Sequence, residues 1–137
     1  MATTTAALSI SNDIASTSVS TSADMTLFKA GTTEGMDTMV SVSKKLTSTS
    51  QVDLITAASV STSHNYVYIS NAGTSTTEYF NVGIGNAGGG SPTDTEEIGR
   101  LYGGDWMFIP WTADTNEDIY VTPSVATEIA VEYIVFS

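Results

Sequence analysis

The feature that most constrains the fold of this sequence is an alternation of apolar and polar residues with a period of two. In residues 40–46, for example, Val40 and Val42 alternate with Ser41 and Ser43. This period indicates half-buried β-strands, because successive side chains of a strand point to opposite faces of a sheet. Comparable alternation, or a short apolar run, occurs at residues 8–14, 19–27, 52–60, 66–69, 80–84, 106–111, 119–121 and 129–135.

Turn-rich segments separate these windows, at residues 31–35, 71–73, 86–92 and 103–105. Short strands with regular turns predict an all-β protein, and we expect a jelly-roll-like antiparallel β-sandwich of about 8–9 strands. The best helical candidate, residues 94–101, is short and contains Gly99, so we expect little or no helix. A length of 137 residues predicts one domain, residues 1–137, with residues 1–7 as a candidate extended N-terminal arm.

The charge and composition exclude several classes of partner and chemistry. The net charge is −11 with four basic residues, so the chain cannot neutralise many phosphates, and we expect neither nucleic acid nor an anionic membrane as partner. No apolar run reaches the roughly 18 residues of a membrane-spanning helix. The chain contains no cysteine, which excludes disulfides, thiolate metal sites and a cysteine nucleophile.

Two motifs suggest ligand sites that their context does not support. Residues 83–88 fit the pattern GxGxxG, but Gly89, Gly90 and Pro92 follow where a dinucleotide site needs a helix. We interpret the segment as a glycine loop between strands. Residues 114–118, DTNED, resemble the start of a calcium loop, but Ile119 and Val125 stand where an EF-hand needs glycine and glutamate. An acidic hairpin turn explains this segment better, with a looser calcium site as the alternative.

The remaining polar candidates for catalysis are four acids and one histidine. Glu96, Glu97, Glu128 and Glu132 contain the carboxylates that glycoside hydrolysis would need, but acids on the outward side of a strand usually serve solubility. His64 is the single histidine, and no Gly-x-Ser-x-Gly elbow accompanies it, so we interpret it as a loop residue. We therefore assign no catalytic, cofactor-binding or metal-ligating residue, and we expect no enzyme and no cofactor.

Aromatic residues concentrate in the second half of the chain. They are Tyr66, Tyr68, Tyr79, Tyr102, Trp106, Phe108 and Trp111. Aromatic side chains at strand spacing belong mainly to cores and subunit interfaces, and we favour that interpretation here. The alternative is an exposed platform on which sugar rings stack.

Three stretches together resemble a known class of protein. They are YVYISNAGTSTTEYFNVGI at 66–84, EIGRLYGGDWMFIPW at 97–111 and DIYVTPSVATEIAVEYIVF at 118–136. This order of strands and turns is similar to that of small all-β virion structural proteins of tailed bacteriophages, of the capsid decoration or cement type. The resemblance covers about half of the chain and carries over no catalytic residue.

The resemblance implies a virion structural protein that binds the outer capsid surface and stabilises the shell by bridging capsomers. Its implied partners are the major capsid protein and copies of itself, with a trimer favoured. Its implied location is the exterior of a capsid assembled in the host cytoplasm. Two alternatives stay open: a phage tail, neck or fibre component, and a carbohydrate-binding β-sandwich module.

Overall fold

The alternating pattern forms strands throughout the computed structural model, which describes residues 3–14, 17–60, 64–85, 95–114 and 117–137. The described residues form ten strands and one short 3-10 helix at Ala57–Ser59. The strands are β1 (Thr4–Ile14), β2 (Thr17–Leu27), β3 (Met39–Leu46), β4 (Val52–Ile55), β5 (Asn65–Asn71), β6 (Tyr79–Gly85), β7 (Thr95–Tyr102), β8 (Trp106–Trp111), β9 (Ile119–Pro123) and β10 (Ile129–Phe136). The prediction of an antiparallel all-β sandwich is confirmed.

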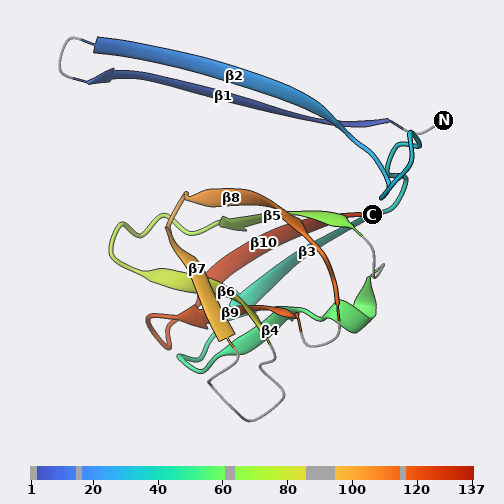
Figure 1. Ribbon diagram of the computed structural model, residues 1–137. Coiled ribbons are helices and arrows are strands. Elements are labelled where there is room, and N and C mark those ends of the chain that lie inside the picture. The colour runs from blue at the N-terminus through green and yellow to red at the C-terminus, as the bar shows by residue number, and fades with distance from the viewer. Residues whose placement is uncertain (1–2, 15–16, 61–63, 86–94, 115–116) are drawn as a thin grey trace. The chain divides into compact units, whose positions relative to one another are not determined.

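The chain divides into two compact units, Met1–Asp37 and Thr38–Ser137. The single domain of residues 1–137 with residues 1–7 as an extended arm stays a prediction. Within the described part of that arm, residues 4–7 pair with residues 24–27 in a hairpin. The reason for the separate unit is that, among the described strands, β1 and β2 pair only with each other and form a two-stranded sheet. In Figure 1 they run side by side as a long ribbon.

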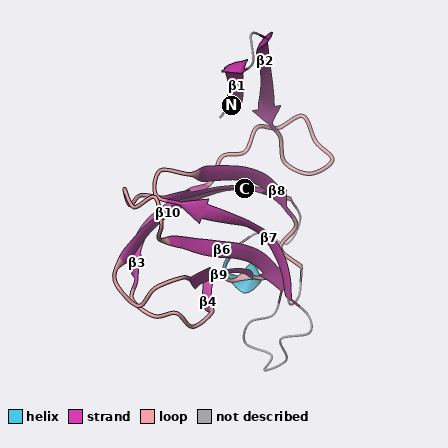
Figure 2. Cartoon of the chain, turned by 90° about the vertical axis from the view of Figure 1, so that its left-hand side faces the viewer, coloured by secondary structure: helices cyan, strands magenta, loops and turns pink. Residues whose placement is uncertain are grey.

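The second unit is a sandwich of two four-stranded sheets, visible as two layers in Figure 2. Their strand orders are β3-β10-β5-β8 and β4-β9-β6-β7. The pairings are nested along the chain, because β3 pairs with β10, β4 with β9, β5 with β8 and β6 with β7. An antiparallel ribbon rolled up in this way has the winding of a jelly roll.

The core lies between these two sheets and consists of the inward residues of each strand. Its fully buried members include Val67, Ile69, Phe80, Val82, Ile119, Val121 and Val131. In β5, buried and half-buried residues alternate without interruption over all seven positions. This alternation is the pleat of a strand that covers a core with one face only.

Two local predictions differ from the structure. The window at 52–60 ends its strand at Ile55, and a 3-10 turn follows, in which the amide of Ala57 donates to Asp118 Oδ1 at 2.7 Å. The helical candidate at 94–101 is largely strand β7, because pairing with β6 satisfies its backbone from residue 95 onward. In the described part of the chain, no helix is long and apolar enough to cross a membrane.

Candidate interaction surfaces

The glycine motif at 83–88 begins inside strand β6 and serves packing. Gly83 is paired with Tyr120 of β9, and a Cβ atom at Gly83 would lie 2.2 Å from the Tyr120 ring. Gly85 ends the strand with a φ of 148°, a conformation that other residues rarely adopt. Residues 86–88 lie outside the described residues. The described half of the motif is therefore the end of strand β6, where Gly83 leaves room for the Tyr120 ring, and it is not the start of a helix.

The acidic segment at 114–118 is described at three of its five positions, since residues 115–116 lie outside the described chain. The amide of Glu117 donates to the Asp114 carbonyl at 3.1 Å, which is a turn contact, and Asp118 accepts from Ala57 as above. Among the described residues, no group of three or more His, Asp or Glu side chains is placed to hold a metal ion.

The four glutamates are distributed over two sheets and are not assembled into a carboxylate pair. Glu96 and Glu97 lie on β7, where Glu97 accepts a hydrogen bond from Asn81 Nδ2 at 2.8 Å. Glu128 forms an ion pair with Lys45 at 2.8 Å, beside the other sheet. Glu132 is exposed on β10.

His64 packs against an aromatic ring. Its imidazole lies edge-on to Tyr66, with ring centroids 4.7 Å apart. The residues that precede it, 61–63, lie outside the described chain. The observed contact is that of an aromatic neighbour at the start of β5.

The two tryptophans of β8 have opposite surroundings. Trp111 is 3% exposed, and its indole Nε1 donates to the Glu117 carbonyl at 2.8 Å, so it belongs to the core. Trp106 is 52% exposed. The preferred interpretation of the aromatics as core residues therefore holds for Trp111 and not for Trp106, and Trp111 cannot contribute to a sugar-stacking platform.

Trp106 belongs to a cluster on the outer face of the sheet β3-β10-β5-β8. The Tyr66 ring stacks on the Phe108 ring, with ring centroids 5.5 Å apart and an angle of 6° between the ring planes. The ring centroids of Tyr68 and Trp106 are 6.1 Å apart. Ile134 is paired with Tyr68 across the ladder, and Phe136 with Tyr66. We call this set the aromatic face: Tyr66, Tyr68, Trp106, Phe108, Ile134 and Phe136.

The outer face of the other sheet is chemically different. Arg100 Nε donates to Asn81 Oδ1 at 3.0 Å, and the Arg100 guanidinium lies 4.0 Å from the centre of the Tyr79 ring. The Tyr79 ring in turn packs against the Tyr102 ring, with ring centroids 5.1 Å apart. Here a guanidinium group covers an aromatic ring, whereas on the aromatic face the polar neighbour of a ring in the described part of the chain is His64, edge-on to Tyr66.

The β1–β2 hairpin also has two chemically distinct faces. Its register places the even-numbered residues of β1 and the odd-numbered residues of β2 on one face. We call the apolar side chains Ala6, Leu8, Ile10, Ala23 and Met25 of this side the apolar hairpin face; Thr4, Asn12 and Thr21 lie on the same side. The opposite face carries Thr5, Ser9, Ser11, Ser20, Ser22 and Asp24. Leu8, Ile10 and Met25 are 41%, 48% and 40% exposed, so the apolar hairpin face is in contact with solvent.

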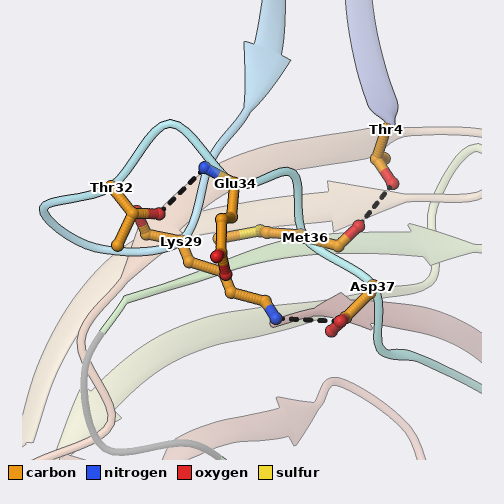
Figure 3. A network of polar contacts seen from close by, with 6 residues as sticks. All are labelled: Thr4, Lys29, Thr32, Glu34, Met36 and Asp37. Carbon is orange, nitrogen blue, oxygen red and sulfur yellow. Dashed lines mark hydrogen bonds and ion pairs between the residues drawn. The ribbon is translucent and has the colours of Figure 1, made fainter. Parts of the chain in front are cut away.

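The base of the hairpin is held by a small polar network (Figure 3). Lys29 Nζ donates to Asp37 Oδ2 at 2.8 Å, and this hydrogen bond raises the pKa of Lys29. Thr4 Oγ1 donates to the Met36 carbonyl at 3.3 Å, and the Met36 amide donates to Leu27. The loop that leaves β2 is therefore tied back to both strands of the hairpin.

Comparisons with known proteins find little. No family model matches the chain, and no curated protein matches it. A solved structure that matches is the mitogen derived from Yersinia pseudotuberculosis, with 12% sequence identity and a TM-score of 0.44. The match covers 72% of this chain and 85% of the mitogen. At this identity and TM-score, the activity of the mitogen is not carried over to this chain.

These findings contradict the prediction of a capsid decoration protein. The structural comparison returned a bacterial mitogen rather than a virion protein, and nothing in the comparisons favours a tail, neck or fibre component. The physical reason for the error is that the resemblance consisted of the order of strands and turns, and β-sandwiches of unrelated function share such an order. The sequence signal for the apolar hairpin face was present in the alternation of residues 8–27, but it was interpreted as sandwich strands.

Proposed function

We propose that this chain is a non-catalytic, self-assembling protein, and that the β1–β2 hairpin is the arm through which its copies associate. The observation that carries the proposal is the solvent exposure of the apolar hairpin face, in particular of Leu8, Ile10 and Met25. An isolated two-stranded hairpin is at best marginally stable in water and needs a further strand or a packed face. A second copy supplies such a face.

The edges of the hairpin support the same proposal. Each of its strands has eleven residues, and neither contains a lysine, an arginine or a proline. Proteins that stay monomeric usually protect long edge strands with such residues or with bulges. The continuous register over eleven pairs also lacks a bulge. Both the face and the edges of the hairpin are therefore suited to association.

The test is the oligomeric state of the full chain, measured by sedimentation velocity over a range of concentrations. We expect the wild-type chain to form an oligomer and the double variant Leu8→Glu/Ile10→Glu to sediment as a monomer of about 14.4 kDa. The matched control is Ser9→Glu/Ser11→Glu, which adds the same charge to the same strand on the opposite face. This control should remain oligomeric.

Two results would overturn the proposal. One is a wild-type chain that is monomeric at every concentration. The other is equal dissociation by the test and control variants, because the effect would then come from added charge and not from the apolar hairpin face. Tryptophan fluorescence serves as the folding control, since both tryptophans lie in β8 of the sandwich.

A further inference from the structure

The aromatic face and the apolar hairpin face are two exposed apolar surfaces on one chain. Trp106 is half exposed, and Tyr66, Tyr68, Phe108, Ile134 and Phe136 are each half-buried although they point away from the core. The alternate residues of β5, Val67 and Ile69, are fully buried. This burial shows that Val67 and Ile69 face the core, and that Tyr66 and Tyr68 lie on the outer face of the sheet. An apolar patch of this kind on a monomer often marks an interaction surface.

We propose that the aromatic face is the docking surface for the apolar hairpin face of a neighbouring copy, so that copies associate by exchanging hairpins. This inference rests on the proposed function. It adds the partner surface: the hairpin of one copy lies on the sheet β3-β10-β5-β8 of the next. The contact is between two different surfaces, so a closed pair or the predicted trimer forms when every hairpin is exchanged.

The areas favour exchange over contact between two hairpins. Eleven residues of about 3.4 Å and two strands about 4.8 Å apart give the hairpin a face of about 350 Å². The outer face of the sheet β3-β10-β5-β8, which carries the aromatic face, is four strands wide and about six residues long, so its area is about 400 Å². Hairpin-to-hairpin contact would cover only the first area and leave the rings in water. A hairpin about 10 Å wide that crosses a face about 20 Å long overlaps it over about 200 Å². Because each copy both gives and receives a hairpin, exchange covers about 400 Å² per copy, more than hairpin-to-hairpin contact, and it also covers aromatic rings.

The chemistry of the two surfaces is complementary. The hairpin contributes aliphatic side chains and Met25, and a thioether packs favourably against aromatic rings. Both surfaces are sheet faces with side chains repeating every second residue, so they can interdigitate as the two layers of a sandwich do, about 10 Å apart. The polar hairpin face, with Asp24, then remains in water.

The first test compares two exposed apolar residues on different sheets. Trp106 on β8 is 52% exposed and Ile98 on β7 is 46% exposed. We expect Trp106→Glu to weaken self-association by about tenfold or more, as loss of an interface tryptophan commonly does. Ile98→Glu, the matched control, should leave association unchanged. Equal effects of the two variants would overturn the inference.

The second test uses the absence of cysteine from the chain. A Leu8→Cys copy is mixed with a differently tagged Trp106→Cys copy and oxidised, so that any mixed disulfide joins two copies. We expect the mixed disulfide to form in preference to the disulfide between two Leu8→Cys copies. The reverse preference would show that hairpins bind one another.

The two proposals fail in different ways. If the wild-type chain is monomeric, both fall. If Leu8→Glu/Ile10→Glu dissociates the oligomer while Trp106→Glu does not, the proposed function stands and the docking of hairpins on the aromatic face is refuted.

Discussion

Replacement of Gly83 by alanine tests how tightly the outer layer of the sandwich is packed. A Cβ atom at this position would lie 2.2 Å from both Cζ and Oη of Tyr120, and 2.6 Å from the Glu96 carbonyl oxygen. Carbon atoms in contact are normally about 3.5–4.0 Å apart, so the Tyr120 ring would have to move by about 1.3–1.8 Å. The ring is 5% exposed, and its displacement uncovers buried surface.

The expected cost is large because one of the two obstacles is backbone. Overpacking typically costs about 1–3 kcal/mol, and we expect the upper end here, since the Glu96 carbonyl belongs to strand β7 and cannot rotate away. For a unit of this size, about 3 kcal/mol corresponds to a fall in Tm of about 10 °C or more. Gly99→Ala is the matched control, because its Cβ would meet only the Met107 methyl group, at 3.8 Å.

The assay is urea unfolding monitored by tryptophan fluorescence, with the free energy of unfolding compared between the wild-type chain and both variants. A double-mutant cycle with Tyr120→Ala divides the cost between the two obstacles, since removal of the ring should abolish the part that the ring causes and leave the part that the Glu96 carbonyl causes. The reasoning is refuted if Gly83→Ala costs no more than Gly99→Ala, or if its cost is unchanged when the Tyr120 ring is absent.

Two further predictions concern buried polar groups of the sandwich. Burial and the nearby Asp118 carboxylate raise the pKa of Asp53, and its Oδ1 atom is buried without a hydrogen-bond partner among the described residues. With a raised folded-state pKa, the stabilisation that protonated Asp53 provides is complete below the unfolded-state pKa and is lost as pH rises through the folded-state pKa. We therefore expect Asp53→Asn to raise the free energy of unfolding at neutral pH and to lose this advantage in acid, as measured by urea titrations over pH; a gain that persists unchanged below the unfolded-state pKa would contradict this account. Asn71 is 2% exposed, and its side chain donates to the Leu101 carbonyl at 3.1 Å and accepts from the Gly73 amide at 3.0 Å. Asn71→Ala should therefore cost about 1–3 kcal/mol in thermal or urea unfolding, because it leaves buried groups unpaired, and a neutral result would show that water replaces them.

The orientation of the aromatic residues illustrates what the sequence contained and what was missed. Trp106 and Trp111 are an odd number of residues apart on one strand, so the pleat alone places them on opposite faces. Their parity was therefore sufficient to separate a core tryptophan from a surface one. Parity did not say which was which, because residues 66–69 and 106–111 are apolar at almost every position.

The helical candidate at 94–101 shows a different limit. Its residues have little preference for a strand by themselves, and Gly99 weakens either structure. The segment is strand β7 because it lies along the free edge of β6 and pairs with it over seven positions. Tertiary pairing therefore decided a structure that local preference left undecided.

By itself, the sequence determined that this chain is a β protein with one apolar side to most of its strands, because the period of two matches the pleat and no other regular structure. It also determined the acidic charge and the absence of thiol chemistry. Only the tertiary structure decided that residues 4–14 pair with residues 17–27 in a two-stranded sheet, and that one sheet of the sandwich carries stacked aromatic rings on its outer face. The reason is that alternation specifies which side of a strand is apolar, whereas the choice of partner strand depends on contacts between residues far apart in the chain.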